Sequence, residues 1–374
     1  MIAQVLFWLC VALVLHAYFG YPLWLLARAR WRPRPSLKIA QTPPVTAVVV
    51  VHDGAAHIEA KLACLLALDY PPDQLRVLVA CDGCNDASAA LARRAGDPRV
   101  RVLEFTERRG KAACLNDAMA CVDDDIVLLT DVRQRLQPGA LRALVANLSD
   151  ASVGAVGGEL QLDDGGSGFA RGVGAYWRVE TAIRRAESAS GSTVGVSGAL
   201  YALRRPLFEP LPPGTVLDDV LVPMRIARAG YRVLLEPAAV AFDRAAQEAA
   251  QERPRKIRTL AGNYQLLQLA PWLLDPRRNP LWFRFVSHKL LRLLAPWALA
   301  ALLPLSALLA PHQLVYLLAL LGLLGLVALA LAGRVVPPLA RLLPVRLATA
   351  FCSLNLFSAQ GLIAFARNRS LHLW

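Results

Sequence analysis

Acidic and basic side chains follow short apolar runs at several places between residues 45 and 131. Asp53, Asp82 and Asp131 each lie within two residues of the end of such a run, and Lys111 follows Gly110 at the start of a helical segment. A carboxylate can accept a hydrogen bond from a ring N–H group of a nucleobase. A lysine at a helix N-terminus can approach a phosphate together with the free backbone N–H groups there. These residue types and their spacing predict a crevice that holds a nucleotide.

The elements that must position these side chains are four short apolar runs, at residues 45–51, 75–80, 100–103 and 125–130. They alternate with segments of helical character, which predicts a parallel sheet buried on both faces. Ligands of such sheets bind outside the carboxyl ends of the strands, where the polar loops converge. We therefore predict an α/β, Rossmann-like domain and an enzyme that holds a nucleotide.

The two ends of the chain carry most of its apolar residues. Of its 374 residues 56% are hydrophobic, and this length leaves room for one α/β domain of about 250 residues and a membrane part. About 20 apolar residues cross ~30 Å of hydrocarbon, which gives four candidate spans, 2–26, 293–309, 314–332 and 347–366. The second is the shortest and contains two prolines, so a re-entrant or interfacial helix is the alternative there.

Basic residues beside the apolar stretches predict the orientation in the membrane. The first stretch lacks the basic start and the Ala-x-Ala site of a signal peptide. Lysine and arginine in short loops mark the cytoplasmic side, which places the α/β domain in the cytoplasm and the N-terminus outside; these residues are Arg28, Arg30, Arg32, Arg34, Lys38, Arg284, Lys289 and Arg292. We predict a multi-pass protein of the cell (inner) membrane. The orientation of the C-terminus stays open, because Arg367 and Arg369 follow the last stretch.

The charge and the cysteines exclude other classes. The net charge of +13 is concentrated beside the apolar spans, as expected for contact with an anionic leaflet, so we predict a lipid bilayer as partner and no nucleic acid. The cysteines lie in spans or in a domain expected in the reducing cytoplasm, so disulfides are not expected. Cys81 and Cys84 form a lone C-x-x-C pair with no second Cys or His pair nearby, so zinc is not expected either.

Several short motifs carry a family resemblance by their order and spacing. They are Leu66–Pro72, Asp82-Gly83-x-x-Asp86, Gly110-Lys111 with Leu115-Asn116, Thr130-Asp131, Tyr176-Trp177-x-x-Glu180, Glu187-Ser188, Gly195-x-Ser197-Gly198-Ala199, Leu217-Asp218-Asp219 and Arg228–Val233. Each is weak alone, but together they resemble the membrane-bound family 2 glycosyltransferases, inverting enzymes of the GT-A fold that build polysaccharides or glycolipids. The resemblance covers about residues 40–290.

The resemblance implies a domain order and a substrate class. We expect a transmembrane helix at 1–28, a GT-A domain at 40–250, interfacial amphipathic helices at 251–292 and about three membrane helices at 293–374. The implied activity is hexosyl or N-acetylhexosaminyl transfer, with inversion, from a nucleotide-diphospho-sugar to a saccharide or lipid-linked acceptor. Interfacial aromatic anchors are expected at Trp272, Trp282, Phe283 and Phe285. A flexible loop near the acceptor is expected at 165–168.

Five residues are expected to bind the donor: Asp53, Asp82, Lys111, Asp131 and Arg258. Asp53 and Asp82 are expected at the nucleobase, although Asp and Gly after a strand also form plain turns. Lys111 and Arg258 are expected at the diphosphate. Arg258 lies where relatives carry Gln-x-x-Arg-Trp, but the Gln and Trp are absent here. The aromatic platform that holds an acceptor sugar in processive synthases is therefore missing at this position.

Asp131 is implied to handle the ribose and a divalent cation, as the first acid of the family's Asp-x-Asp motif. Arg133 stands in place of the second acid. Mg²⁺ usually takes one or two carboxylates plus phosphate oxygens, so we still expect Mg²⁺ or Mn²⁺, with Asp131 as its protein ligand. A second departure is Gly54-Ala55, where many relatives have an acidic residue after an Asn.

Two acids open a helix with apolar positions at Val222, Ile226 and Ala229. Asp218 is expected to act as its N-cap, since Asp is favoured there. Inverting transfer needs a base that takes the proton of the acceptor hydroxyl. The resemblance implies that Asp219 is this base.

Two other functions compete with sugar transfer. A nucleotidyltransferase could use the same crevice, but no Gly-rich triphosphate loop appears near the N-terminus. A catalytically impaired relative could bind nucleotide as a scaffold, because the second acid and the Trp are missing.

Overall fold

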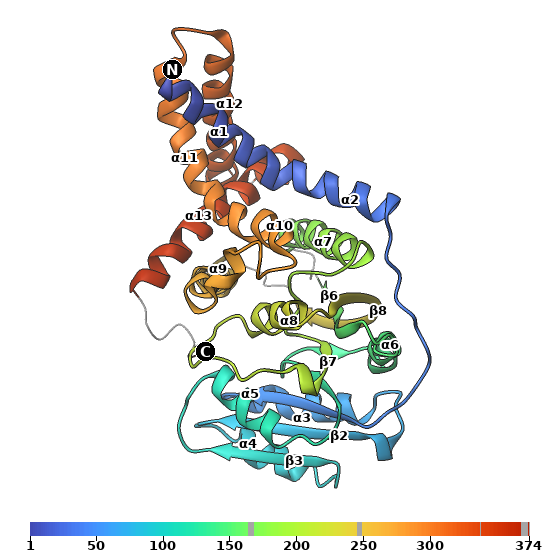
Figure 1. Cartoon of the computed structure of the whole chain (residues 1–374). Coiled ribbons are helices and arrows are strands. Elements are labelled where there is room, and N and C mark those ends of the chain that lie inside the picture. Colours follow the sequence, from blue (N-terminus) through green and yellow to red (C-terminus); the bar gives the residue numbers. More distant parts are fainter. Residues whose placement is uncertain (164–167, 245–248, 337, 368–372, 374) are drawn as a thin grey trace.

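The computed structural model describes residues 1–163, 168–244, 249–336, 338–367 and 373, with the backbone alone for 163, 168–176, 249–252 and 340. A mixed α/β domain lies at one end and a group of long apolar helices at the other (Figure 1). Most of the glycine-rich segment at 165–168, expected to be a flexible loop, lies outside the described residues.

The predicted parallel sheet forms the first half of the domain. Its strands are β1 (Val45–Val51), β2 (Leu75–Asp82), β3 (Val100–Phe105) and β4 (Ile126–Leu129). β1 lies between β2 and β4, and β2 also pairs with β3, all in parallel. The carboxyl ends of β1, β2 and β4 therefore meet at one edge, which is the arrangement that places the polar loops together.

The second half of the sheet is not visible in the local sequence pattern. It contains β5 (Arg135–Leu136), β6 (Val153–Asp163), β7 (Tyr201–Arg204) and β8 (Arg232–Arg244). The full order is β3-β2-β1-β4-β7-β6-β8-β5. β7 runs antiparallel to β4 and β6, β8 is parallel to β6, and β5 is antiparallel to β8. The sheet is thus mixed, and the α/β expectation is confirmed.

Helices cover both faces of the sheet. One core contains side chains of α3 (Ala55–Leu66), α4 (Ser88–Arg94) and α6 (Ala140–Asn147), and the other contains side chains of α5 (Lys111–Ala120) and α8 (Asp218–Arg228). Along β1, alternate valines enter the first and second cores, as the period of a strand requires. Burial on both faces explains why this strand reads as a continuous run of valine.

Four helices in the described residues are long and apolar enough to cross a membrane: Ile2–Trp31, Trp282–Leu309, Leu314–Val335 and Leu343–Arg367. The first joins α1 (Ile2–Leu15), the π turn η1 (His16–Gly20) and α2 (Tyr21–Trp31). The second joins α10 (Trp282–Phe285), the π turn η5 (Val286–Leu290) and α11 (Leu291–Leu309). The others are α12 (Leu314–Val335) and α13 (Leu343–Arg367).

The second of these helices begins before the apolar stretch predicted at 293–309, and both of its prolines lie inside α11. Phe285 therefore does not serve as an interfacial anchor, because it is 2% exposed and packs in the second core. Phe283 is exposed, as an interfacial ring would be. The predicted stretch began too late because polar residues interrupt the apolar pattern at the start of the helix, between Trp282 and residue 293.

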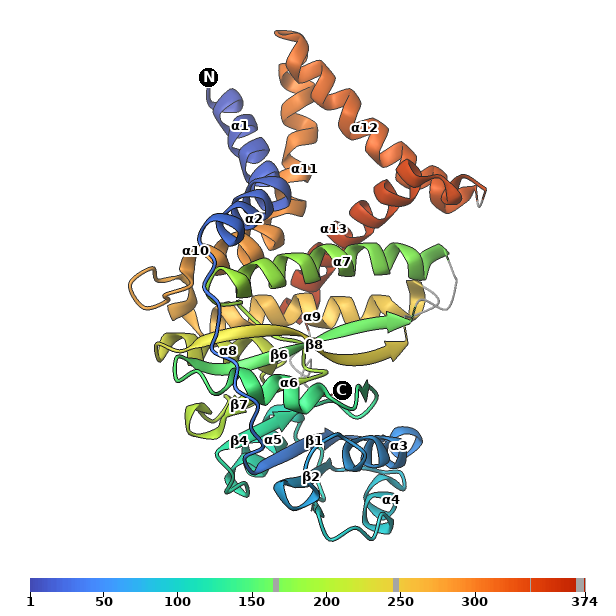
Figure 2. The ribbon, with the colours of Figure 1, turned by 90° about the vertical axis from the view of Figure 1, so that its right-hand side faces the viewer.

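Two long helices lie between the sheet and the apolar helices. They are α7 (Gly168–Ala189) and α9 (Ala249–Leu269), and Figure 2 shows them running across the top of the domain. Short 3-10 turns complete the chain: η2 (Pro72–Gln74), η3 (Arg205–Leu207), η4 (Pro271–Leu274) and η6 (Leu339–Arg341). The two π turns are joined by a hydrogen bond of 2.9 Å between His16 Nε2 and Ser287 Oγ.

Candidate functional site

Charged side chains from distant parts of the sequence meet around Gly198. A Cβ atom added at Gly198 would lie 3.5 Å from Asp131 Oδ2, 3.6 Å from Lys111 Nζ and 3.8 Å from Asp219 Oδ2. Asp131 follows β4, while Lys111 and Asp219 lie in the first turns of α5 and α8. Asp131, Lys111 and Asp219 are thus brought together, and Gly198 adds no side chain to the space between them.

Lys111 is held as a cation between two carboxylates. Its Nζ lies 3.0 Å from Asp131 Oδ1 and 3.1 Å from Asp218 Oδ2. Burial alone would lower the pKa of Lys111, but Asp131, Asp218 and Asp219 raise it above its ordinary value. Lys111 therefore stays positively charged at any physiological pH and can neutralise a phosphate.

Asp219 has the electrostatic properties of a general base. Burial and the neighbouring carboxylate of Asp218 raise the pKa of Asp219 to about 6, although Lys111, Arg184 and Lys289 act in the opposite direction. A base whose pKa lies near the working pH accepts protons most effectively, because it is mostly ionised yet basic.

Asp218 does not cap its helix. The N-cap residue of α8 is Leu217, and Asp218 is the first helical residue. Its buried side chain pairs with Lys111 instead, so the expectation of an N-capping role was wrong. The Coulomb attraction of the buried ammonium group outweighs a backbone cap at this position.

Asp82 organises the loop that leads to Lys111. Its side chain is fully buried, and its Oδ1 and Oδ2 accept hydrogen bonds from the backbone N–H groups of Arg109 (2.7 Å) and Gly110 (2.8 Å). Gly110 has a φ of +88°, which glycine adopts without strain. These contacts give Asp82 a positioning role, and direct contact with a nucleobase stays a prediction.

Asp53 lies in the loop after β1. Its φ of +47° is unusual for a residue other than glycine. Its Oδ1 accepts a hydrogen bond of 2.8 Å from the backbone N–H of Asn85, while the side chain is 42% exposed. One carboxylate oxygen therefore stays accessible to a ligand.

Arg258 faces the acidic cluster from α9. Burial lowers the pKa of Arg258, and Asp218, Asp131 and Asp219 oppose this shift. Among the described residues its Nε atom is buried and has no hydrogen-bond partner. A partly buried guanidinium with a free donor suits an anionic ligand such as a phosphate.

Arg133 turns toward β8. Its Nη2 lies 3.4 Å from Asp243 Oδ2, and the same oxygen accepts a hydrogen bond of 2.7 Å from Gln134 Nε2. A pair between Arg133 and Asp243 leaves Asp131 as the acid that this loop supplies to the cluster.

The cluster fits a divalent cation together with phosphates. Among the described residues, buried Asp218 Oδ2 has the Lys111 ammonium as its ion-pair partner at 3.1 Å and accepts no further hydrogen bond, and the Asp131 side chain is 34% exposed. Both offer the oxygen ligands that Mg²⁺ and Mn²⁺ prefer.

Two residues of the site escaped the sequence analysis. Tyr201, on β7, has a buried hydroxyl without a hydrogen-bond partner among the described residues, and Asp218, Asp219 and Asp131 help burial to raise its pKa. Lys61 is 2% exposed on α3 and donates hydrogen bonds to Thr130 Oγ1 (2.6 Å) and to the carbonyl of Gln134 (2.9 Å). The sequence feature that could have identified Lys61 is its position next to Leu62, on the apolar face of the amphipathic helix α3.

Lys61→Met is expected to lower sugar transfer roughly tenfold or more, because the loop that carries Asp131 loses its support and small displacements in a site are costly. The free energy of unfolding should change by less than about 1.5 kcal/mol, since a buried charge is replaced by an apolar chain of similar length. Steady-state rates and thermal denaturation measure the two effects. Unchanged transfer with a large loss of stability would limit Lys61 to the core.

Gly198→Ala is expected to fold normally and to weaken donor binding by roughly tenfold, the effect of one misplaced carbon in a pocket. The new Cβ has contacts of 3.5–3.8 Å, which are ordinary van der Waals distances, but it fills the space between the charged groups. Gly139→Ala is the matched control, because nothing lies within 4 Å of a Cβ there. Donor affinity measured by calorimetry should fall for Gly198→Ala alone, and equal affinities would place the donor elsewhere.

A buried polar network joins the domain to the apolar helices. Glu187 accepts hydrogen bonds from Tyr21 Oη (2.5 Å) and faces His288 Nδ1 (2.8 Å), while Glu180 faces His288 Nε2 (3.1 Å) and Arg292 Nη1 (2.9 Å). Burial alone would raise the pKa of Glu187, but His288 lowers it to about 2. The acids of α7 are thus fixed against the first two long apolar helices, close to the cations that face Asp219.

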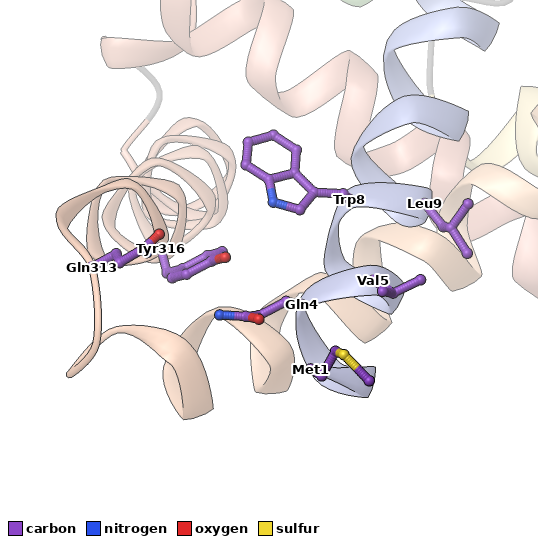
Figure 3. A pocket seen from close by; sticks show the side chains of 7 residues that line it. All are labelled: Met1, Gln4, Val5, Trp8, Leu9, Gln313 and Tyr316. Carbon is purple, nitrogen blue, oxygen red and sulfur yellow. The ribbon is translucent and has the colours of Figure 1, made fainter.

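A hollow at the far tip of the apolar helices is unrelated to this chemistry. Figure 3 shows its lining, which carries no acidic, basic or imidazole side chain and consists of Met1, Gln4, Val5, Trp8, Leu9, Gln313 and Tyr316. It lies at the opposite end of these helices from the domain (Figure 1).

Known proteins resemble this chain in sequence. The sequence model of the family described as "Glycosyltransferase like family 2" matches residues 43–262. A poly-beta-1,6-N-acetyl-D-glucosamine synthase of Staphylococcus aureus (strain COL) is 21% identical over 244 residues, which are 63% of this chain and 58% of the relative. An N-acetylglucosaminyltransferase of Rhizobium meliloti (strain 1021) is 26% identical over 249 residues, 61% of this chain and 58% of the relative. The chain thus spans a little more than half the length of these relatives.

A solved structure resembles nearly the whole chain. The mannosyltransferase PcManGT from Pyrobaculum calidifontis, in complex with GDP-Man and Mn²⁺, is similar with a TM-score of 0.73 at 26% sequence identity. The similarity covers 97% of this chain and 99% of that one. The likeness therefore extends from the α/β domain to the apolar helices.

Proposed function

Because the chain belongs to glycosyltransferase family 2, we propose that it moves a sugar from a nucleotide-diphospho-sugar to a saccharide or lipid-linked acceptor at a membrane. The sugar is a hexose or an N-acetylhexosamine, and the product is a polysaccharide or glycolipid. The observation that carries this proposal is the convergence of Asp131, Lys111 and Asp219 around Gly198. A carboxylate, a cation and a base at one point are the groups that sugar transfer from a diphosphate needs.

The donor lies across the carboxyl ends of the strands in this proposal. Its base approaches Asp53 in the loop after β1, and its diphosphate approaches Lys111 and Arg258. Asp131 and Asp218 would hold a Mg²⁺ or Mn²⁺ ion, which neutralises charge on the diphosphate when it is bound. The Mn²⁺ in the similar mannosyltransferase supports this assignment.

In the chemical step the acceptor hydroxyl gives its proton to the Asp219 carboxylate, and the acceptor oxygen forms a bond to the anomeric carbon of the donor sugar. The bond between that carbon and the diphosphate oxygen breaks on the opposite face, so the configuration inverts. Lys111 and Arg258 stabilise the charge that develops on the leaving group. Arg184 of α7 and Lys289 of η5 add positive charge near Asp219.

The alternative of an inert scaffold has less support. The base, the flanking cations and an Asp131 carboxylate are all in place, and Arg133 is turned toward Asp243 and not into the cluster. The missing second acid therefore does not block the site. A nucleotidyltransferase finds no support in the family match.

Transfer can be tested with the full-length protein in detergent and a panel of nucleotide sugars that includes GDP-mannose and UDP-N-acetylglucosamine, each with Mn²⁺. We expect release of nucleoside diphosphate from one donor, stimulated by a membrane lipid extract. Binding of donors without any cleavage, with and without the extract, would favour the scaffold.

We propose that the protein is multi-pass in the cell (inner) membrane with its α/β domain in the cytoplasm, supported by the four long apolar helices and the basic cluster from Arg28 to Lys38. A reporter fused after residue 40 is expected to be active only if it works in the cytoplasm. Activity of a periplasm-dependent reporter at the same position would contradict this orientation.

A further inference from the structure

Three potential metal ligands meet at the carboxyl ends of β1 and β2. His52 and Asp53 follow β1, and Cys84 follows β2 in the adjacent loop. One ligand atom of each residue lies within 4.8 Å of the others. In the sequence, Cys81 and Cys84 form a pair without further metal ligands nearby; His52 and Asp53 join Cys84 only because β1 and β2 pair in parallel.

His52 is prepared to bind through Nε2. Its Nδ1 lies 2.7 Å from the backbone carbonyl oxygen of Asp82. A carbonyl only accepts, so Nδ1 carries the proton and Nε2 keeps its lone pair. A backbone carbonyl on the second ring nitrogen is the arrangement that orients metal-binding histidines. The side chain is 7% exposed, so the ring has little freedom to turn.

The spacing suits a tetrahedral ion. His52 Nε2 lies 3.4 Å from Asp53 Oδ2. Two tetrahedral zinc ligands with bonds of about 2.05 Å lie about 3.3 Å apart. Asp53 Oδ1 is held by the backbone N–H of Asn85, which leaves Oδ2 directed at the imidazole. Cys84 Sγ donates a hydrogen bond of 3.5 Å to the carbonyl oxygen of Val51, which the thiol gives up when the sulfur loses its proton and binds a metal ion.

We propose that His52, Asp53 and Cys84 form a binding site for Zn²⁺ or a similar borderline-soft divalent ion. Nitrogen, oxygen and thiolate ligands select such ions over Mg²⁺ and Mn²⁺. The site is separate from Asp131, and its fourth coordination position opens to solvent because Asp53 is exposed. A bound ion occupies the place proposed for the nucleobase, so it excludes the donor. This exclusion rests on the proposed function, whereas metal binding does not.

Cobalt is the probe for the site, because Co²⁺ bound to thiolate has a characteristic charge-transfer absorption. Titration of the full-length protein in detergent is expected to show this band and its loss when Zn²⁺ is added. Cys84→Ser should abolish the band, while Cys121→Ser, which removes an exposed cysteine elsewhere, should leave it intact. Absence of the band in the wild-type protein, or its loss only in Cys121→Ser, overturns the site.

His52→Asn provides a second variant, because its side-chain amide can donate to the carbonyl of Asp82 as Nδ1 does while the ligand atom Nε2 is removed. It should fold as the wild type and bind Co²⁺ at least roughly tenfold more weakly, the smallest effect expected when a metal site loses one of its interactions. Equal affinity would remove His52 from the site. A circular-dichroism melt of each variant shows whether the fold is kept.

Competition with the donor tests the exclusion. Zn²⁺ is expected to weaken binding of the nucleotide sugar that the protein accepts as donor, at least tenfold in the wild-type protein. It should have no effect on donor binding in Cys84→Ser. Equal donor affinity with and without Zn²⁺ would contradict the inference that the metal ion excludes the donor. Whether the metal ion binds at all is then still tested by the cobalt titration. If no nucleotide sugar binds, the proposed function fails, while the cobalt result stands by itself.

Discussion

Asp219→Asn is expected to lower sugar transfer by roughly 10²–10⁴-fold, the contribution of a general base, while donor affinity stays close to that of the wild type. The amide keeps the shape of the side chain but cannot take the acceptor proton. Transfer rates and donor binding by calorimetry separate the two effects. Asp73→Asn, which changes an exposed carboxylate in η2, is the matched control. It should bind the donor and transfer sugar as the wild type does.

The pH dependence gives an independent readout of the same residue. Because the pKa of Asp219 is raised to about 6, the fraction of ionised base increases as the pH rises through 6. The rate of the wild-type enzyme should therefore fall about tenfold for each unit below pH 6 and level off above it. A rate that is flat from pH 5 to 8, or a variant that keeps more than half its turnover, would assign the base to another residue.

Asp131→Asn is expected to remove the metal dependence of donor binding and to lower transfer roughly a hundredfold. A cation is worth several kcal/mol at a developing charge, and a loss of about 3 kcal/mol corresponds to such a factor. The change also removes one of the two carboxylates that hold Lys111. Titration of Mn²⁺ with and without nucleotide measures the effect, and wild-type binding should be tight only when nucleotide is present.

Arg133→Gln serves as the control for this experiment. Arg133 contacts Asp243 on β8, so its loss should leave Mn²⁺ affinity and donor affinity nearly unchanged. A surface ion pair contributes at most about 1 kcal/mol to stability. A large change in metal affinity for Arg133→Gln would show that this side chain enters the crevice. Full activity of the wild-type protein in chelator would contradict the metal assignment itself.

The attachment of the domain to the apolar helices has a consequence for the site. Glu180 and Glu187 of α7 are tied through His288 and Tyr21 to the first two long apolar helices. The same helix, α7, carries Arg184, whose charge acts to lower the pKa of Asp219. Buried polar contacts therefore hold α7 against the apolar helices, and they are costly to break singly because a lone charge would be left buried.

The sequence by itself determined the parallel half of the sheet and the positions of its polar loops. Strands buried on both faces read as continuous apolar runs, and β1 with its valines shows this directly. The order of the motifs also located Lys111, Asp131 and Asp219, because each is anchored to the end of a strand or the start of a helix. These are local features, and local patterns report them.

Only the tertiary structure decided how distant segments meet. The antiparallel β7 and the pairing of β6 with β8 join residues that no local periodicity relates. The partner of Asp218 is Lys111 and that of Arg133 is Asp243, although capping preference and spacing suggested otherwise. The sequence indicates only that Lys61 is a helical lysine, and the structure shows that it donates a hydrogen bond to Thr130. His52 and Cys84 meet because β1 and β2 pair in parallel. In each case the energy depends on a partner far away in the chain, which a sequence pattern does not specify.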